Sequence, residues 1–205
     1  MAGFRQISYI AILSLAALPA LAHDAAEKVG YVAPHGGGFM AGLSHPVLGF
    51  DHLLAMISVG VLSAQMGGRA IWQVPLTFVF LMLLGGVAGM QKVPLFSVEL
   101  GIAISVLALG IAIAAESKFS ALLAITFVGF FAIFHGHAHG TEMPYLAKPV
   151  LYALGFVAGT AAIHIAGVVI GLVSQRYQQG VAVLRYTGAA IAGIGFHLIL
   201  MPVLG

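Results

Sequence analysis

The chain has 205 residues, of which 61% are hydrophobic and 7% are charged, and its formal net charge is +2 at pH 7. Soluble globular domains carry about 25% charged residues, so this composition excludes a soluble enzyme, a disordered chain and a coiled coil. Nine histidines outnumber both the eight Lys and Arg residues and the six acidic residues. The sequence contains no basic run, which excludes nucleic-acid binding, and no cysteine, which excludes disulfides and thiolate metal ligands.

The first 22 residues are typical of a cleavable secretory signal peptide. Arg5 supplies the positive n-region, a short apolar stretch follows, and Ala-Leu-Ala at 20–22 forms the small-x-small cleavage site. An uncleaved first helix is the alternative, and either reading places residue 23 outside the cytoplasm. Residues 23–44 are polar and glycine-rich, and they predict a flexible periplasmic segment that carries His23 and His35.

Residues 45–205 form the predicted transmembrane permease domain. Six apolar stretches follow one another with short connections, and each is long enough for a helix to cross a hydrocarbon core of about 30 Å. Backbone polar groups in lipid must pair internally, and alternation with period two is absent, so helices are favoured over a barrel. We therefore expect an all-α polytopic membrane protein with six transmembrane helices, at approximately 46–66, 71–90, 95–115, 119–138, 148–174 and 182–203.

Glycine spacing predicts where these helices touch. Small residues four apart let two helix backbones approach closely in lipid, and the chain has three such pairs: Gly85/Gly89, Gly155/Gly159 and Gly167/Gly171. Six spans are also the number found in a 3+3 inverted repeat. Residues 46–115 do not align convincingly onto 119–203, which leaves a repeat open.

Most ionisable side chains fall at the exterior ends of the predicted spans. Such groups are costly in lipid, and they usually face a bundle interior or a water-filled cavity and mark a pathway. We therefore expect a polar site at the periplasmic mouth. His164 is the exception, because it lies near mid-membrane. The sequence assigns no role in the site to this residue or to Glu99, His137 and His197. The residues that converge are His45, Asp51 and His52 on the first span, and His135, His137, His139 and Glu142 at the end of the fourth.

The fourth span carries a spacing typical of metal binding. His135 and His139 are four residues apart, so they share one helix face about 6 Å apart in rise and can clamp one ion. Glu142, three residues further on, completes a set of two nitrogens and one oxygen if the helix continues past Gly136 and Gly140.

The first span carries a second group of candidate ligands. Asp51 and His52 are adjacent and can both border one cavity between helices. His45 lies two turns before His52, about 10 Å away along a regular helix, which is too far to share one ion. We expect His45 to form a separate metal-binding position that an entering ion reaches before His52. Imidazole and carboxylate ligands without thiolate suit Ni²⁺, Co²⁺, Zn²⁺ or Cu²⁺.

Two segments, HPVLGFDHLLAMISVG at 45–60 and FHGHAHGTEMP at 134–144, resemble the signatures of the HupE/UreJ family of hydrogenase/urease accessory nickel permeases. The resemblance extends over the whole chain. It implies uptake of Ni²⁺, and by extension Co²⁺, across the bacterial inner membrane, with the mature N-terminus in the periplasm, to supply hydrogenase or urease assembly. It also implies the metal-site positions, which fall on His45, Asp51, His52, His135, His139 and Glu142.

The predicted function is therefore secondary or facilitated metal uptake rather than catalysis. The metal ion is the transported substrate, and no bound cofactor is expected. No Gly-Lys-Ser/Thr occurs, so a Walker A site is excluded. The alternatives are an intramembrane zinc-dependent hydrolase, a bis-histidine haem electron carrier, and a metal sensor or scaffold. The expected partners are a divalent metal ion and the lipid bilayer, and the sequence is compatible with an oligomer.

Overall fold

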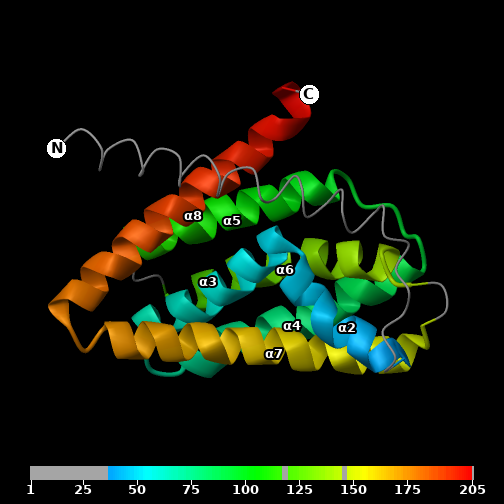
Figure 1. Ribbon diagram of the computed structural model, residues 1–205, viewed down its shortest axis with the longest axis horizontal. Helices are drawn as coiled ribbons and strands as arrows, with labels where there is room; N and C mark the ends of the chain where they lie inside the picture. The colour runs from blue at the N-terminus through cyan, green and yellow to red at the C-terminus, as the bar shows by residue number, and fades with distance from the viewer. Residues whose placement is uncertain (1–36, 117–119, 145–146, 205) are drawn as a thin grey trace, which may run out of the picture.

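The computed structural model describes residues 37–116, 120–144 and 147–204, and over these ranges the chain is helical apart from short connections. The predicted signal peptide, His23 and His35 lie outside the described residues. The helices in the described ranges (Figure 1) are α2 (Gly37–Leu48), α3 (Phe50–Met66), α4 (Ala70–Met90), α5 (Val98–Ala114), α6 (Ala121–Thr141), α7 (Pro149–Ser174) and α8 (Gln178–Leu204).

Four of the described helices, α4, α6, α7 and α8, are long and apolar enough to cross a membrane. Helices α2 and α3 meet at 81°, and they supply a fifth span if the bent pair is treated as one. Helix α5 has 17 residues and is about 25 Å long, which is shorter than a hydrocarbon core of about 30 Å. The all-α class is confirmed, and the helices are those of a polytopic membrane protein. The number of six spans stays a prediction.

Residues 37–44, for which the glycine run predicts a flexible segment, are instead helical and belong to α2. The reason is tertiary, because α2 packs along α7. A Cβ at Gly42 would overlap the carbonyl oxygen of Tyr152, and a Cβ at Gly155 would overlap that of Phe39. Gly38 and Gly42 therefore serve as a helix contact surface rather than as a loop.

Helix α3 lies at the centre of the bundle and contacts every other helix that the structure describes. Ala55, Met56 and Val59 on this helix are completely buried. The side chains that face outward from the other helices are large and apolar, for example Leu76 and Phe80 on α4 and Ile165 on α7. An apolar exterior around a packed interior is the arrangement that a lipid environment stabilises.

The predicted glycine contacts are confirmed. Gly85 and Gly89 of α4 lie against the carbonyl oxygens of Ile133 and His137 on α6, too close to admit a Cβ. The other two predicted pairs lie in the contacts of α7 with α2 and with α3. Close backbone approach at α4–α6 brings the histidine-bearing end of α6 into the interior of the bundle.

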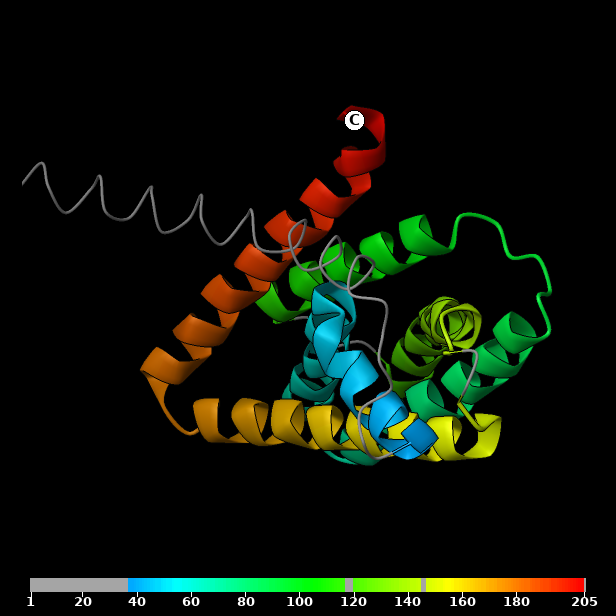
Figure 2. The same ribbon diagram turned by 45° about the vertical axis from the view of Figure 1, so that its right-hand side comes forward.

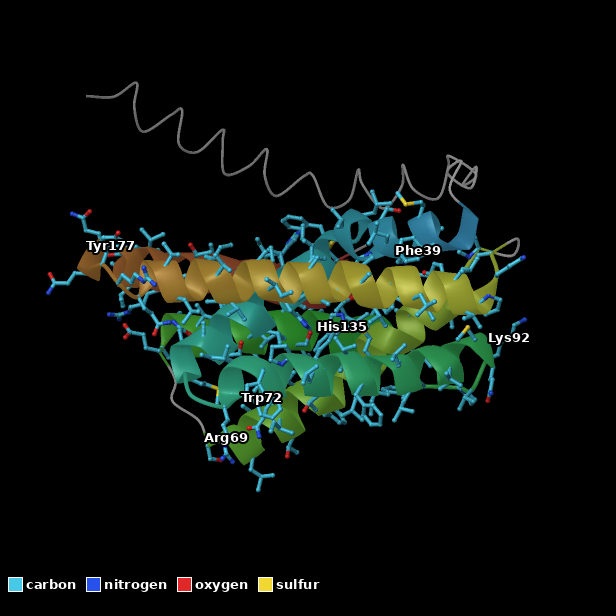
Figure 3. All side chains as sticks on the ribbon, turned by 90° about the horizontal axis from the view of Figure 1, so that it is seen from below. Phe39, Arg69, Trp72, Lys92, His135 and Tyr177 are labelled. Carbon is cyan, nitrogen blue, oxygen red and sulfur yellow. The ribbon has the colours of Figure 1, made fainter. Side chains whose placement is uncertain are left out.

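The two ends of the bundle carry different basic residues. Figure 3 shows Arg69 and Tyr177 at one end of the molecule and Lys92 at the other, with His135 between them. We refer to these as the Arg69 end and the Lys92 end. The sequence-derived topology expects Arg69 on the cytoplasmic side and Lys92 on the exterior side, which requires them to lie at opposite ends.

Candidate metal site

The bend between α2 and α3 positions the first group of site residues (Figure 2). Gly49 joins the two helices with an extended backbone (φ −80°, ψ 106°). Pro46, in the last turn of α2, has no N–H to continue the helical hydrogen bonds. His45 therefore lies on one helix axis and the Asp51–His52 pair on another, so the two-turn separation expected along one regular helix does not apply.

Asp51 determines which nitrogen of His52 is available to a ligand. Oδ1 of Asp51 accepts hydrogen bonds from Nδ1 of His52 at 2.8 Å and from its backbone N–H at 2.8 Å. Donation from Nδ1 leaves the lone pair on Nε2, and over the described ranges this buried Nε2 has no hydrogen-bond partner. A Cβ at Gly49 would lie 3.1 Å from Nδ1 of His52, so the glycine leaves room for the ring.

His45, His139 and Glu142 form what we call the surface triad. One ligand atom from each lies within 4.8 Å of the others, and this is the one such group of three among the residues that the structure describes. Nε2 of His45 donates to Oε2 of Glu142 at 3.0 Å, and the rings of His45 and His139 meet edge-on at 4.7 Å. Two ligands of one ion lie at most about 4.2 Å apart when each bond is about 2.1 Å. The triad therefore needs only a small side-chain adjustment to be able to hold one ion.

Glu142 lies just beyond the end of α6 and connects the triad to solvent. Its side chain is 54% exposed. Partial burial by itself would raise the pKa of this carboxyl group, but the hydrogen bond with His45 and the electrostatic influence of the neighbouring His52 and His45 rings outweigh it, so the pKa lies below its usual value. Glu142 is therefore ionised at neutral pH and offers a charged oxygen ligand where water still reaches.

Beyond the triad the imidazoles continue inward as the buried imidazole group, defined as His52, His135 and His139. The ring centroids of His52 and His139 are 4.3 Å apart, and those of His52 and His135 are 4.8 Å apart. His139 belongs to both groups and joins them. The two groups therefore form one continuous cluster of rings.

Ser105 of α5 accepts a hydrogen bond from His135, just as Asp51 accepts one from His52. The hydroxyl of Ser105 donates to the carbonyl oxygen of Ile102 at 2.6 Å, so its oxygen accepts from Nε2 of His135 at 2.9 Å. This leaves the lone pair on Nδ1 of His135, and within the described part of the chain that atom has no partner. Neither nitrogen of His139 has one there either. Buried polar atoms are almost always hydrogen-bonded, so these nitrogens indicate a site built for a ligand.

The grouping of the ligands differs from the one predicted along α6. The spacing predicts His135, His139 and Glu142 as one set. The structure instead joins His139 and Glu142 to His45, and it places His135 deeper, against His52 and Ser105. Helix α6 does continue past its glycines to Thr141, because Gly136 and Gly140 lie against α4.

The remaining polar residues lie apart from both groups. His137 donates from Nε2 to the carbonyl oxygen of Val93 at 2.7 Å and so anchors the loop after α4. Glu99 and His197 are exposed, and His164 is buried further along α7. Sequence reasoning did not identify Ser105 or the aromatic residues Phe78, Tyr152 and Phe156. A serine inside an apolar helix was the one available signal for Ser105.

Comparisons with known proteins identify the family of the chain. The profile described as "HupE / UreJ protein" matches residues 11–198. The chain is 42% identical over 188 residues to "Protein HupE" of Rhizobium leguminosarum bv. viciae, an alignment that covers 91% of this chain and 94% of that protein. No solved structure matches. The chain therefore belongs to the HupE/UreJ family of hydrogenase/urease accessory proteins, which are transport or accessory proteins and not enzymes.

Proposed function

We propose that this protein takes up a divalent transition metal, Ni²⁺ or Co²⁺, across the bacterial inner membrane and thereby supplies hydrogenase or urease maturation. One observation carries the proposal. A continuous row of imidazoles begins at the exposed His45–Glu142 pair and passes through His139 and His52 to His135. The donors are nitrogen and carboxylate oxygen, which suit these ions.

The ion loses its water in stages along this row. Glu142 and Asp51 provide negative charge, which lowers the cost of moving a dication into low dielectric. Successive rings are 4.3 to 4.8 Å apart, so the ion gains a new ligand before it leaves the previous one. Two charges moving down 100 mV release about 4.6 kcal/mol, so the membrane potential alone drives accumulation.

Haem ligation fits the same histidines poorly. Two axial imidazoles must lie on opposite faces of a porphyrin, with the iron between their nitrogens. The rings of His52 and His139 are in direct contact at 4.3 Å, and those of His45 and His139 at 4.7 Å. A porphyrin does not fit between rings that already touch, which favours an ion passed from ring to ring.

The direct test is ⁶³Ni²⁺ accumulation in bacteria that lack their own nickel uptake system. The full chain is expected to raise accumulation well above the empty vector. His139→Ala is expected to reduce it at least about tenfold, because His139 belongs to both ligand groups. His197→Ala, at an exposed histidine, is the matched control and should transport normally. Accumulation no greater than with the empty vector contradicts transport, whereas an active His139→Ala variant contradicts the site alone.

A further inference from the structure

A further buried histidine lies beyond the site described above. His164 of α7 is 2% exposed, and among residues 37–116, 120–144 and 147–204 neither of its ring nitrogens has a hydrogen-bond partner. Its ring meets the ring of Phe78 edge-on at 5.1 Å, and Phe78 also contacts His135 at 5.5 Å. Phe78 therefore links the innermost member of the buried imidazole group to His164.

Thr160, one helical turn before His164, brings a hydroxyl oxygen and, through its contact with Met82, a thioether sulfur to the same helix contact. Thr160 precedes His164 by four residues on the same face of α7, and its hydroxyl donates to the thioether sulfur of Met82 at 3.8 Å. Met82 in turn follows Phe78 by four residues on α4. Both Thr160 and Met82 are completely buried. The contact between α4 and α7 is thus lined by the imidazole of His164, the hydroxyl of Thr160 and the thioether of Met82. None of these groups carries a permanent charge.

Packing alone does not account for an imidazole at this position. A buried polar group without a partner costs about 1 to 3 kcal/mol, and a leucine of similar size would fill the space without that cost. A histidine that joins helices does so by a hydrogen bond across the contact, and in the described part of the structure neither nitrogen makes one. Both nitrogens are therefore available to a visiting ligand.

We propose that His164 is an inner binding position for a divalent transition metal ion, separated from the buried imidazole group by the ring of Phe78. This inference rests on the proposed uptake function and adds to it a second metal-binding position, deeper in the bundle. Imidazole and thioether are ligands of the later first-row metals. With one imidazole and no carboxylate at hand, this position holds the ion more weakly than the surface triad, which allows the ion to leave.

Uptake and binding by His164→Leu test the role of the ring. The variant removes both nitrogens but keeps an apolar side chain of similar size, so its melting temperature should equal or exceed that of the wild type. Its ⁶³Ni²⁺ accumulation should fall at least about tenfold. Equilibrium Ni²⁺ binding to the surface triad of the purified full chain should be unchanged. His197→Leu is the matched control for loss of one histidine and should behave as the wild type.

A spectroscopic test detects the ion at this position directly. The sequence contains no cysteine, so His164→Cys introduces the single thiol of the chain. Co²⁺ added to this purified variant should produce a thiolate-to-metal charge-transfer band in the near ultraviolet. Ile191→Cys places a thiol at a buried position on α8, and it should remain without the band.

The outcomes separate the two proposals. Wild-type accumulation at the empty-vector level contradicts the uptake function, while a charge-transfer band from His164→Cys would still support the inner position. If the wild type transports nickel and His164→Leu transports equally well, the inner position is contradicted. A His164→Cys variant without the band, or a His164→Leu variant with a lowered melting temperature, also overturns the proposal, because the ring would then serve packing.

Discussion

At the scale of single residues, the site depends on side chains that direct the histidines as much as on the histidines themselves. Asp51 accepts a hydrogen bond from Nδ1 of His52, and Ser105 accepts one from Nε2 of His135. Each contact leaves the other ring nitrogen with its lone pair and, over the described ranges, without a partner. Partners of this kind fix the tautomer of a ligating histidine and raise its basicity.

Asp51→Asn tests this directing role. The substitution keeps the shape of the side chain, but it removes the charge that favours the Nδ1–H tautomer of His52 and attracts a dication. We expect equilibrium Ni²⁺ affinity and ⁶³Ni²⁺ uptake to fall about 10- to 100-fold, with the fold retained. Glu116→Gln, which removes an acid paired with Arg185, is the control and should change neither. An Asp51→Asn variant with wild-type affinity would show that the negative charge of Asp51 does not direct His52 or attract the ion.

At the scale of helices, the close contact of α4 with α6 is what carries His135 and His139 into the interior. Gly136 lies between them in sequence, on the face that meets α4. A Cβ there would overlap the carbonyl oxygen of Met82, which is backbone and has no rotamer to change. The small residue at this position is therefore a condition for the depth of the site.

Gly136→Ala is expected to destabilise the protein by about 1 to 3 kcal/mol, the usual cost of overpacking, and to reduce nickel uptake because both neighbouring histidines shift. The measurement is the thermal midpoint of the purified chain by circular dichroism. Gly193→Ala on α8 is the matched control. No described atom lies within 4 Å of its added Cβ, so it should leave stability unchanged or raise it by about 0.5 to 1 kcal/mol. Equal midpoints for the two variants would contradict the tight α4–α6 contact.

At the scale of the whole molecule, the proposed metal path runs from an exposed end to a buried one. The surface triad includes an exposed carboxylate, the buried imidazole group follows, and His164 lies beyond Phe78. Arg69 and Lys92 mark the two opposite ends of the bundle. Transport across a membrane requires these ends to face different compartments.

Single-cysteine variants test this orientation, since the chain has no cysteine of its own. Lys92→Cys should react with a membrane-impermeant thiol reagent in intact spheroplasts, because the Lys92 end is expected to face the periplasm. Arg69→Cys should react only after the membrane is permeabilised. Labelling of both variants in intact spheroplasts would contradict the topology, and the reverse pattern would invert it.

The sequence by itself determined the properties that depend on composition and on spacing within one helix. Scarce charge and long apolar stretches predict a helical membrane protein, because backbone in lipid must satisfy its own hydrogen bonds. The glycine pairs predict helix contacts, and these are confirmed. The i, i+4 spacing of His135 and His139 correctly places both on the inner face of α6, where they are buried.

Only the tertiary structure decided which of these residues meet. The helix of residues 37–48 forms because Gly38 and Gly42 pack on α7, although the glycine run in isolation predicts a loop. The 81° bend at Gly49 brings His45 to His139 and Glu142, a grouping that spacing along one helix does not reveal. Ser105 and Phe78 join the site from α5 and α4 for the same reason. Sequence periodicity describes one helix face, whereas the site is made where faces of several helices converge.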